Sequence, residues 1–141
     1  MGSCRPFNRG EYERWMAQAK RTFSSAEEDA RAGYFEWACF KAQQSAEYAV
    51  KGLLRGLGHV AVGHSITRLL RLLAREGVEV PEEVLDAAME LDRHYMAPRY
   101  PNVYHEGPPF EYYSERIAER VLGYARVILS FVEEVVGRWR S

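Results

Sequence analysis

Cysteine and long apolar runs are scarce in this chain of 141 residues. Its two cysteines, Cys4 and Cys39, are too few for a disulfide framework and too far apart for a CxxC metal or redox site. No stretch approaches the ~18 apolar residues that a membrane span requires, and the N-terminal residues lack the apolar core of a secretory signal. We therefore expect a cytoplasmic protein without a membrane segment.

Alternation of apolar and polar residues with a period of two is also missing, which argues against a β-sheet. Glycine and proline number only 11 and 6, so low-complexity disorder is excluded as the main state. Apolar residues make up 47% of the chain and charged residues 28%, as in ordinary globular proteins. The length predicts a single domain, residues 1–141, that needs no disulfide or metal to stabilise its core.

What is present is a spacing of apolar residues by three and four, which is typical of helices that bury one face. Asn8 followed by Glu11 predicts a capped helix start, and Ser65 is a second candidate N-cap. Gly77 predicts a helix end, and Pro81 suits the first turn of the next helix. The predicted helices cover residues 8–33, 35–56, 65–77, 81–95 and 114–137.

This pattern predicts an all-α fold, an antiparallel up-and-down helical bundle of four main helices plus a short one. A segment rich in proline and tyrosine, residues 93–113, precedes the last helix. It holds four of the six prolines and five of the nine tyrosines, so a regular helix is excluded there. Because long ordered loops in compact domains are usually functional, we expect this loop to carry the site.

The net charge of −1 conceals an uneven distribution. Residues 1–75 carry 12 Lys or Arg and 7 Asp or Glu, whereas residues 76–141 carry 7 and 13. Every charged residue between Glu47 and Glu76 is a Lys or an Arg, and every charged residue from Glu76 to Asp92 is an Asp or a Glu. One interpretation is that the two faces pair with each other, and the other is that the basic face meets phosphate.

Arg99 and His105 in the loop are the candidate catalytic residues. Arginine carries a permanent planar charge that can hold a phosphate, and histidine can exchange a proton near neutral pH. Together they supply the minimum for RNA cleavage without a metal: His105 moves a proton and Arg99 stabilises the negative transition state. The structural alternative is that Arg99 pairs with an acid of the fourth helix and that His105 hydrogen-bonds loop carbonyls.

Three further residues are candidate nucleotide or RNA contacts. His64 lies at the start of the third helix, where it could meet a phosphate or could instead fix the loop and the helix cap. Lys51 and Arg55 are one turn apart on the second helix and could extend a basic groove or form a solvated face. His59 and His64 have no thiol or carboxylate near them in the sequence, so we expect no metal and no other cofactor.

Three stretches make the chain resemble the HEPN domain proteins, in particular the prokaryotic group encoded beside minimal nucleotidyltransferases. Their order and spacing agree with that family over nearly the whole chain. The stretches are FKAQQSAEYAVKGLLRGLG (40–58), GHSITRLL (63–70) and LDRHYMAPRYPNVYHEGPPFEYYSERIAERVLGYARVILSFV (91–132).

The resemblance implies an all-α homodimer and a toxin-like, metal-independent endoribonuclease. Many HEPN proteins carry an arginine, four to six further residues and a histidine, as Arg99 and His105 do, and in such dimers the two motifs face each other across a cleft. The implied partner is a minimal nucleotidyltransferase antitoxin, and the implied ligand is RNA or a nucleotide. Tyr100 and Tyr104 complete the set of candidate contacts.

The residues that follow the motif support an alternative. Toxin members often carry, two positions after the histidine, a tyrosine that the partner modifies, whereas Glu106 and Gly107 follow His105 here and Tyr104 precedes it. Other members of the family are non-catalytic. The alternative function is therefore a non-catalytic nucleotide-binding or adaptor subunit that partners a nucleotidyltransferase.

Overall fold

The structure, a computed structural model, describes residues 6–139, so Cys4 lies outside the described residues. Within this range the chain forms five α-helices and two short 3₁₀-helices, and it contains no strand, which confirms the all-α prediction. The elements are α1 (Arg9–Ala32), α2 (Phe35–Gly56), α3 (Ile66–Arg75), α4 (Glu82–Asp92), η1 (Pro101–Val103), η2 (Pro109–Tyr112) and α5 (Glu115–Arg138).

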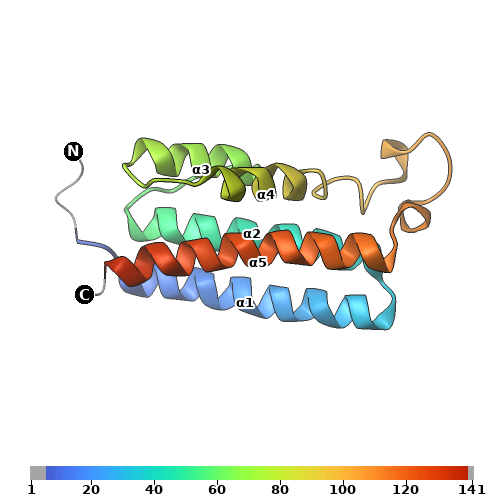
Figure 1. The fold of residues 1–141 in the computed structure, drawn as a ribbon, viewed down its shortest axis with the longest axis horizontal. Helices are drawn as coiled ribbons and strands as arrows, with labels where there is room; N and C mark the ends of the chain where they lie inside the picture. The colour runs from blue at the N-terminus through green and yellow to red at the C-terminus, as the bar shows by residue number, and fades with distance from the viewer. Residues whose placement is uncertain (1–5, 140–141) are drawn as a thin grey trace.

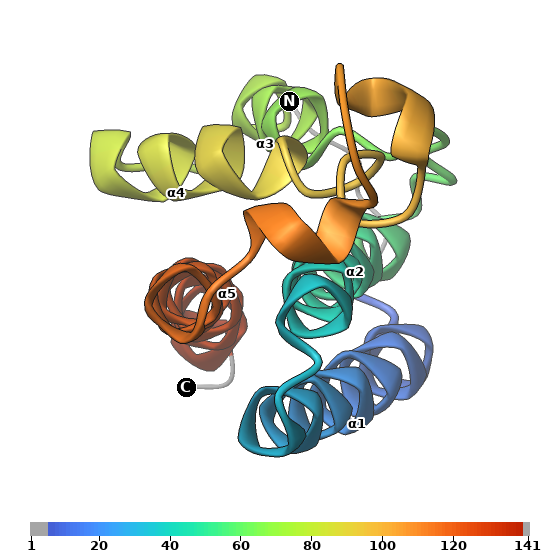
Figure 2. The same ribbon diagram turned by 90° about the vertical axis from the view of Figure 1, so that its right-hand side faces the viewer.

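Three long helices, α1, α2 and α5, lie side by side, and the two short helices α3 and α4 cover α2 and α5 on the side away from α1 (Figure 1). Figure 2 shows the long helices nearly end-on, with α4 inclined to them. The order departs from simple up-and-down alternation, because α2 and α5 both run opposite to α1 and therefore parallel to each other. The proline-rich segment lies at the end of the molecule where α1 turns into α2 and α5 begins.

The helices begin close to the predicted residues, because capping residues in the sequence mark their starts. The Asn8 side chain accepts a hydrogen bond from the Glu11 N–H at 3.0 Å. Ser65 and Ser114 accept equivalent bonds from the first turns of α3 and α5. Pro81 is the N-cap of α4 rather than its first-turn residue, because its backbone is extended at ψ 152° and the helix starts at the next residue.

Small residues on α2 lie at the centre of the core. Cys39 is fully buried among them and is a core residue. These small side chains let α1 approach closely: a methyl group added at Gly52 would lie 2.7 Å from the Trp15 Cβ. No described helix combines the length and apolar composition needed to cross a membrane. The buried alanines of α2 are Ala38, Ala42, Ala46 and Ala49.

The described Lys and Arg residues of the basic run do not pair with the acids of the acidic run, so the first interpretation of the charge pattern is wrong. Within residues 6–139, no ion pair joins a Lys or Arg of residues 51–75 to an acid of residues 76–92. Lys51 pairs instead with Glu47 of its own helix at 2.9 Å. The arginines of α3 are exposed and have no ion-pair partner among these residues: Arg68, Arg71 and Arg75.

Candidate functional site

The segment between α2 and α3, residues 57–65, places His64 against the side of α2. The Gln43 side chain donates a hydrogen bond to the His64 carbonyl oxygen at 3.0 Å, so the segment turns back along α2 before α3 begins. Asp92, the last residue of α4, accepts hydrogen bonds from the Ser65 hydroxyl and from the next two backbone N–H groups at 3.0, 2.7 and 3.1 Å. These bonds hold the start of α3 between α2 and α4.

Glu47 is a buried carboxylate at the centre of a polar network on α2, with only 5% of its surface exposed. It accepts from Lys51 Nζ at 2.9 Å and from Gln43 Nε2 at 3.2 Å, and it lies 3.1 Å from His64 Nδ1. Lys51 is thus paired and its side chain is 14% exposed, so the solvated-face interpretation is wrong for this residue. The network fixes the His64 ring, because a buried charge must keep its hydrogen-bond partners.

Arg99 is held by aromatic rings and by a backbone carbonyl. Its Nε and one Nη donate to the Tyr95 carbonyl oxygen at 2.9 and 2.7 Å. Its guanidinium carbon lies 4.2 Å from the ring centroid of Phe40, 4.7 Å from that of Tyr95 and 4.9 Å from that of Tyr100. No described carboxylate pairs with it, so the structural alternative of an ion pair with the fourth helix is wrong.

Tyr95 connects Arg99 to the Glu47 network. Its ring stacks on the His64 ring with a centroid distance of 4.4 Å and an angle of 16°. The same ring lies beneath the Arg99 guanidinium. We define the Arg99 cluster as Phe40, Glu47, His64, Tyr95 and Arg99, together with Lys51 and Tyr100 at its edges. The structure therefore brings together four of the predicted site residues: Lys51, His64, Tyr100 and Arg99.

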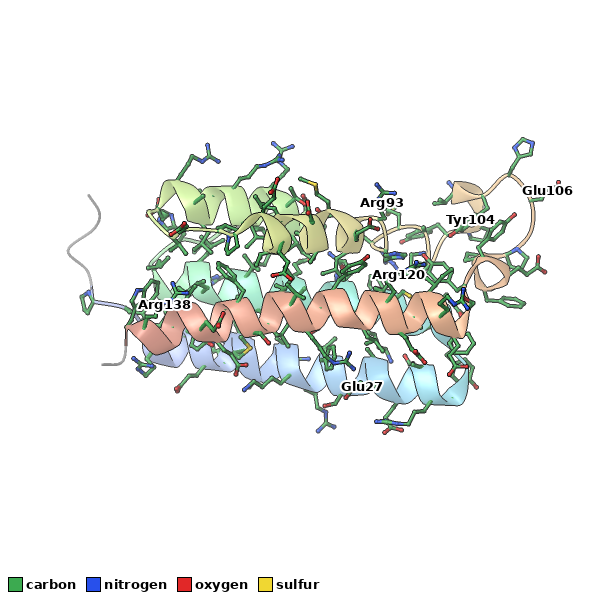
Figure 3. All side chains as sticks on the ribbon, in the orientation of Figure 1. Glu27, Arg93, Tyr104, Glu106, Arg120 and Arg138 are labelled. Atoms are coloured by element: carbon green, nitrogen blue, oxygen red, sulfur yellow. The ribbon has the colours of Figure 1, made fainter. Side chains whose placement is uncertain are left out.

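His105 does not join this cluster within one chain. Its side chain is exposed, and no hydrogen bond, ion pair or ring contact reaches it from the described residues. Glu106, the next residue, lies at the outer edge of the loop in Figure 3, whereas Tyr104 lies closer to the helices. The hydrogen bond to a loop carbonyl that was the structural alternative for His105 is therefore absent from the described contacts.

The other two candidate contacts have aromatic partners outside the Arg99 cluster. Tyr104 stacks on Tyr112 with a centroid distance of 4.1 Å, and the Tyr112 hydroxyl donates to the Glu106 carbonyl oxygen at 2.5 Å. Arg55 lies over the Trp15 ring at 4.9 Å, on the side of α2 that faces α1. Arg55 and Lys51 therefore do not form one continuous basic groove with Arg99.

A partly buried histidine–tyrosine pair at the base of the loop was missed in the sequence. His94 Nδ1 lies 2.9 Å from the Tyr113 hydroxyl, which ties the end of α4 to the start of α5. Burial lowers the pKa of His94 to about 4, and it raises the pKa of Tyr113, with a further contribution from the Tyr104 side chain. No local signal predicted this contact, because the two residues are brought together only by the closure of the loop.

The described residues contain no group of three or more His, Cys, Asp or Glu side chains placed to hold a metal ion. What the geometry does place on the surface is a permanent cation, aromatic faces and an oriented histidine. This arrangement is suited to a ligand that carries both a phosphate and a nucleic-acid base, since arginine hydrogen-bonds phosphate and aromatic side chains stack on bases.

Comparison with known proteins agrees with this arrangement of helices. The model of the HEPN domain family matches residues 12–135, and the chain therefore belongs to the HEPN domain family. That family includes ribonuclease-type toxins. No match was found among curated proteins.

Three solved structures are similar over most of their length. TT1696 from Thermus thermophilus is 44% identical with a TM-score of 0.85, covering 88% of this chain and 97% of that one. ST0689, an archaeal HEPN homologue, is 42% identical with a TM-score of 0.76, covering 89% and 98%. The HEPN domain protein TM0613 from Thermotoga maritima is 35% identical with a TM-score of 0.72, covering 89% and 98%.

Proposed function

We propose that the protein binds the phosphate of RNA or of a nucleotide at the Arg99 cluster. The observation that carries the proposal is the state of the Arg99 guanidinium. It is anchored by two hydrogen bonds to one carbonyl oxygen and stacked on aromatic rings, and no described acid neutralises it. An arginine held this way keeps its remaining N–H groups available for an anion, and less conformational entropy is lost when the anion binds.

The aromatic side chains beside Arg99 favour a ligand that carries a base. Tyr100 is 41% exposed and lies next to the guanidinium, so its ring offers a face on which a base can stack. Base stacking on an aromatic side chain contributes about 1–3 kcal/mol and tolerates different bases. The ligand class is therefore a nucleotide or single-stranded RNA rather than inorganic phosphate.

Substitution of Arg99 tests this proposal. Binding of a fluorescent single-stranded RNA oligonucleotide and of ATP is measured by anisotropy and calorimetry in EDTA. We expect Arg99→Ala to weaken binding at least about tenfold, since a charged hydrogen bond is worth about 1.5–3 kcal/mol. Arg99→Lys should weaken it too, because lysine lacks the planar fork.

Arg126→Ala is the matched control, because Arg126 also lies over an aromatic ring, that of Phe23 at 5.2 Å, but outside the cluster. It should leave binding unchanged. If the Arg99 and Arg126 variants lost the same binding affinity, the loss would be explained by the change in net charge, which would contradict the proposal. Tight binding of RNA with none of ATP would identify RNA as the ligand, and the reverse result would identify a nucleotide.

A second candidate function, a toxin-like endoribonuclease, is favoured by the exposure of His105. In a homodimer, His105 of one copy could reach a phosphate held by Arg99 of the other, as the resemblance implies. The wild-type protein should then cleave RNA in EDTA, and His105→Ala should be inactive. A mixture of Arg99→Ala and His105→Ala chains should regain part of the activity, because mixed dimers contain one intact pair. No recovery in mixed dimers of demonstrated formation would argue against the composite site.

The family resemblance also supports a partner, a minimal nucleotidyltransferase antitoxin, for either function. Co-expression of this chain with a nucleotidyltransferase encoded beside its gene should give a stable complex on size-exclusion chromatography. Tyr104 is the proposed target of modification, and a mass increase on a peptide that contains Tyr104 but not on the Tyr104→Phe chain would support it. Separate elution of the two proteins would argue against the partnership.

A further inference from the structure

The outward face of α3 carries three arginines and no other charge. Arg68, Arg71 and Arg75 are spaced by three and four residues, so they form one stripe along the helix, which we call the α3 stripe. All three are exposed, and the buried side chains of α3 lie on the opposite side of the helix. Packing therefore accounts for the apolar face of α3 but not for the arginines on its outward face.

The exposed arginines of α1 show how a solvated helix face is built in this chain. Arg14 pairs with Glu11, three residues before it. Arg31 pairs with Glu28 in the same way. Within residues 6–139 no ion pair of this kind reaches the α3 stripe. A solvated face normally mixes charges of both signs, whereas a face of one sign creates a field that attracts a polyanion.

The acids that border α3 are engaged elsewhere. Glu76, which follows the last residue of the helix, lies 2.8 Å from His59 Nε2. Asp92 accepts hydrogen bonds from the Ser65 hydroxyl and from the next two backbone N–H groups, so its carboxylate holds the start of the helix. Neither carboxylate pairs with the α3 stripe, and its three positive charges are therefore available to an anion from solution.

The first turn of α3 adjoins the Arg99 cluster in the chain. Ser65, the N-cap of α3, directly follows His64 of the cluster. Arg93, which is next to Asp92, is exposed and has no ion-pair partner in the described part of the chain. Figure 3 shows Arg93 beyond the end of α4, where the chain enters the loop that carries Arg99. Positive charge therefore extends from α3 toward that loop.

We propose that the α3 stripe binds the phosphate backbone of single-stranded RNA, so that one strand contacts both α3 and the Arg99 cluster. This inference rests on the proposed function and narrows its ligand to a polynucleotide, because a mononucleotide offers no phosphate chain that continues onto α3. Arginine binds phosphate oxygens without reading a base, so the stripe contributes affinity and salt dependence but no sequence preference. A single strand is favoured over a duplex, because stacking on the exposed Tyr100 ring needs an unpaired base.

Removal of the three charges tests the proposal. Binding of a fluorescent single-stranded RNA of about 20 nucleotides is measured by anisotropy between about 0.05 and 0.2 M NaCl. In the triple variant Arg68→Gln, Arg71→Gln, Arg75→Gln, the slope of log K against log salt should become shallower by about 2, since each phosphate contact with a single strand contributes about 0.7. At about 0.1 M salt the affinity should fall at least about tenfold. Glutamine has nearly the helix propensity of arginine, and circular dichroism checks that α3 is kept.

The matched control removes three arginines from α1, which lies on the other side of α2 and α5 from α3 (Figure 1). The triple variant Arg14→Gln, Arg21→Gln, Arg31→Gln changes the net charge by the same amount, and all three side chains are exposed. Its affinity for the RNA and its salt slope should stay close to those of the wild-type protein. Equal effects of the two triple variants would reveal a response to net charge and would contradict a site on α3.

The remaining outcomes separate the α3 stripe from the Arg99 cluster. An unchanged salt slope in the α3 variant would overturn the proposal, and weaker RNA binding by Arg99→Ala would then still support the cluster. Binding of ATP but not of RNA by the wild-type protein would also overturn it and leave the cluster as a nucleotide site. If the α3 variant instead lost a salt-sensitive self-association in light scattering while it bound RNA normally, the stripe would be a contact between protein chains. A shallower slope in the α3 variant with unchanged binding by Arg99→Ala would support the stripe and contradict the phosphate site at Arg99.

Discussion

Arg99 and His105 belong to one sequence motif, but the structure places them in opposite environments. Arg99 is partly buried, hydrogen-bonded to a carbonyl and stacked on aromatic rings. His105 is exposed beyond the 3₁₀ turn Pro101–Val103 and contacts no described side chain. A spacing in the sequence therefore predicts which residue types are present, whereas the burial and contacts of each residue decide what it can do. The Arg99 cluster is held by hydrogen bonds and ring contacts, whereas the loop tip, residues 105–107, is exposed.

The strongest way to test this difference is to remove one acid from each region. Glu47→Ala should lower the free energy of unfolding by about 3–5 kcal/mol, because it leaves Lys51 and its neighbours buried without their partner. Glu106→Ala at the exposed tip should change it by less than about 0.5 kcal/mol. Urea unfolding of both variants measures the difference, and similar values for the two would mean that the cluster is not held by its network.

The cap that Asp92 supplies to α3 should show a smaller but clear effect. Asp92→Ala removes three hydrogen bonds to the start of α3, and we expect a loss of about 2 kcal/mol. Asp86→Ala, an exposed acid on the same helix, is the control and should be nearly neutral. A neutral result at Asp92 would show that these bonds do not hold the start of α3.

Acid should weaken the region at the base of the loop through His94. Burial lowers its folded pKa to about 4, while an unfolded histidine has a pKa of about 6.5. The stabilisation is therefore complete above about pH 6.5 and is lost as the pH falls toward 4, because the unfolded chain takes up the proton first. The loss from this residue is on the order of 2 kcal/mol.

Unfolding free energies measured between about pH 7 and pH 4.5 test this expectation. The pH dependence should be smaller in His94→Gln than in the wild-type protein, since the variant has no imidazole to protonate. His105→Gln, which removes the exposed histidine of the loop tip, is the comparison variant. If the free energy of unfolding of His94→Gln depended on pH as strongly as that of the wild-type protein, other groups would be responsible for the pH dependence.

The smallest effect is expected at the loop tip itself. His105→Ala removes an exposed ring that contacts no described residue, so the melting temperature should stay within about 2 °C of the wild-type value. Differential scanning calorimetry measures it. A larger drop would reveal that the tip is held by a second copy of the chain, which would support the composite site.

Much of the fold was predictable because its signals are local. The side chains of the caps Asn8, Ser65 and Ser114 each accept a hydrogen bond from the backbone N–H three residues later. Both partners are therefore recognisable from the sequence spacing. The burial of Cys39 follows in the same way from its place on an apolar helical stripe. These features need no knowledge of what packs against each helix.

The site was predictable only in part, because its contacts join distant segments. Arg99 was predicted as a phosphate-holding group from its chemistry, but its partner, the Tyr95 carbonyl oxygen, depends on the backbone path of the loop. His64 contacts Glu47 from the segment that follows α2, and nothing in the sequence indicates that these two residues are partners. Asp92 looked like one more acid of an acidic run, whereas tertiary structure makes it the cap of another helix.

The contacts of Tyr95 limit which substitutions the Arg99 cluster can accept. Its backbone carbonyl anchors Arg99, while its ring supports both Arg99 and His64. Phe40 contacts Arg99 and the Tyr95 ring, whereas Glu47 contacts His64 and Lys51. A substitution at position 95 therefore affects the settings of Arg99 and His64 together, so phenylalanine, which keeps both the ring and the carbonyl, is the replacement that this position should tolerate best.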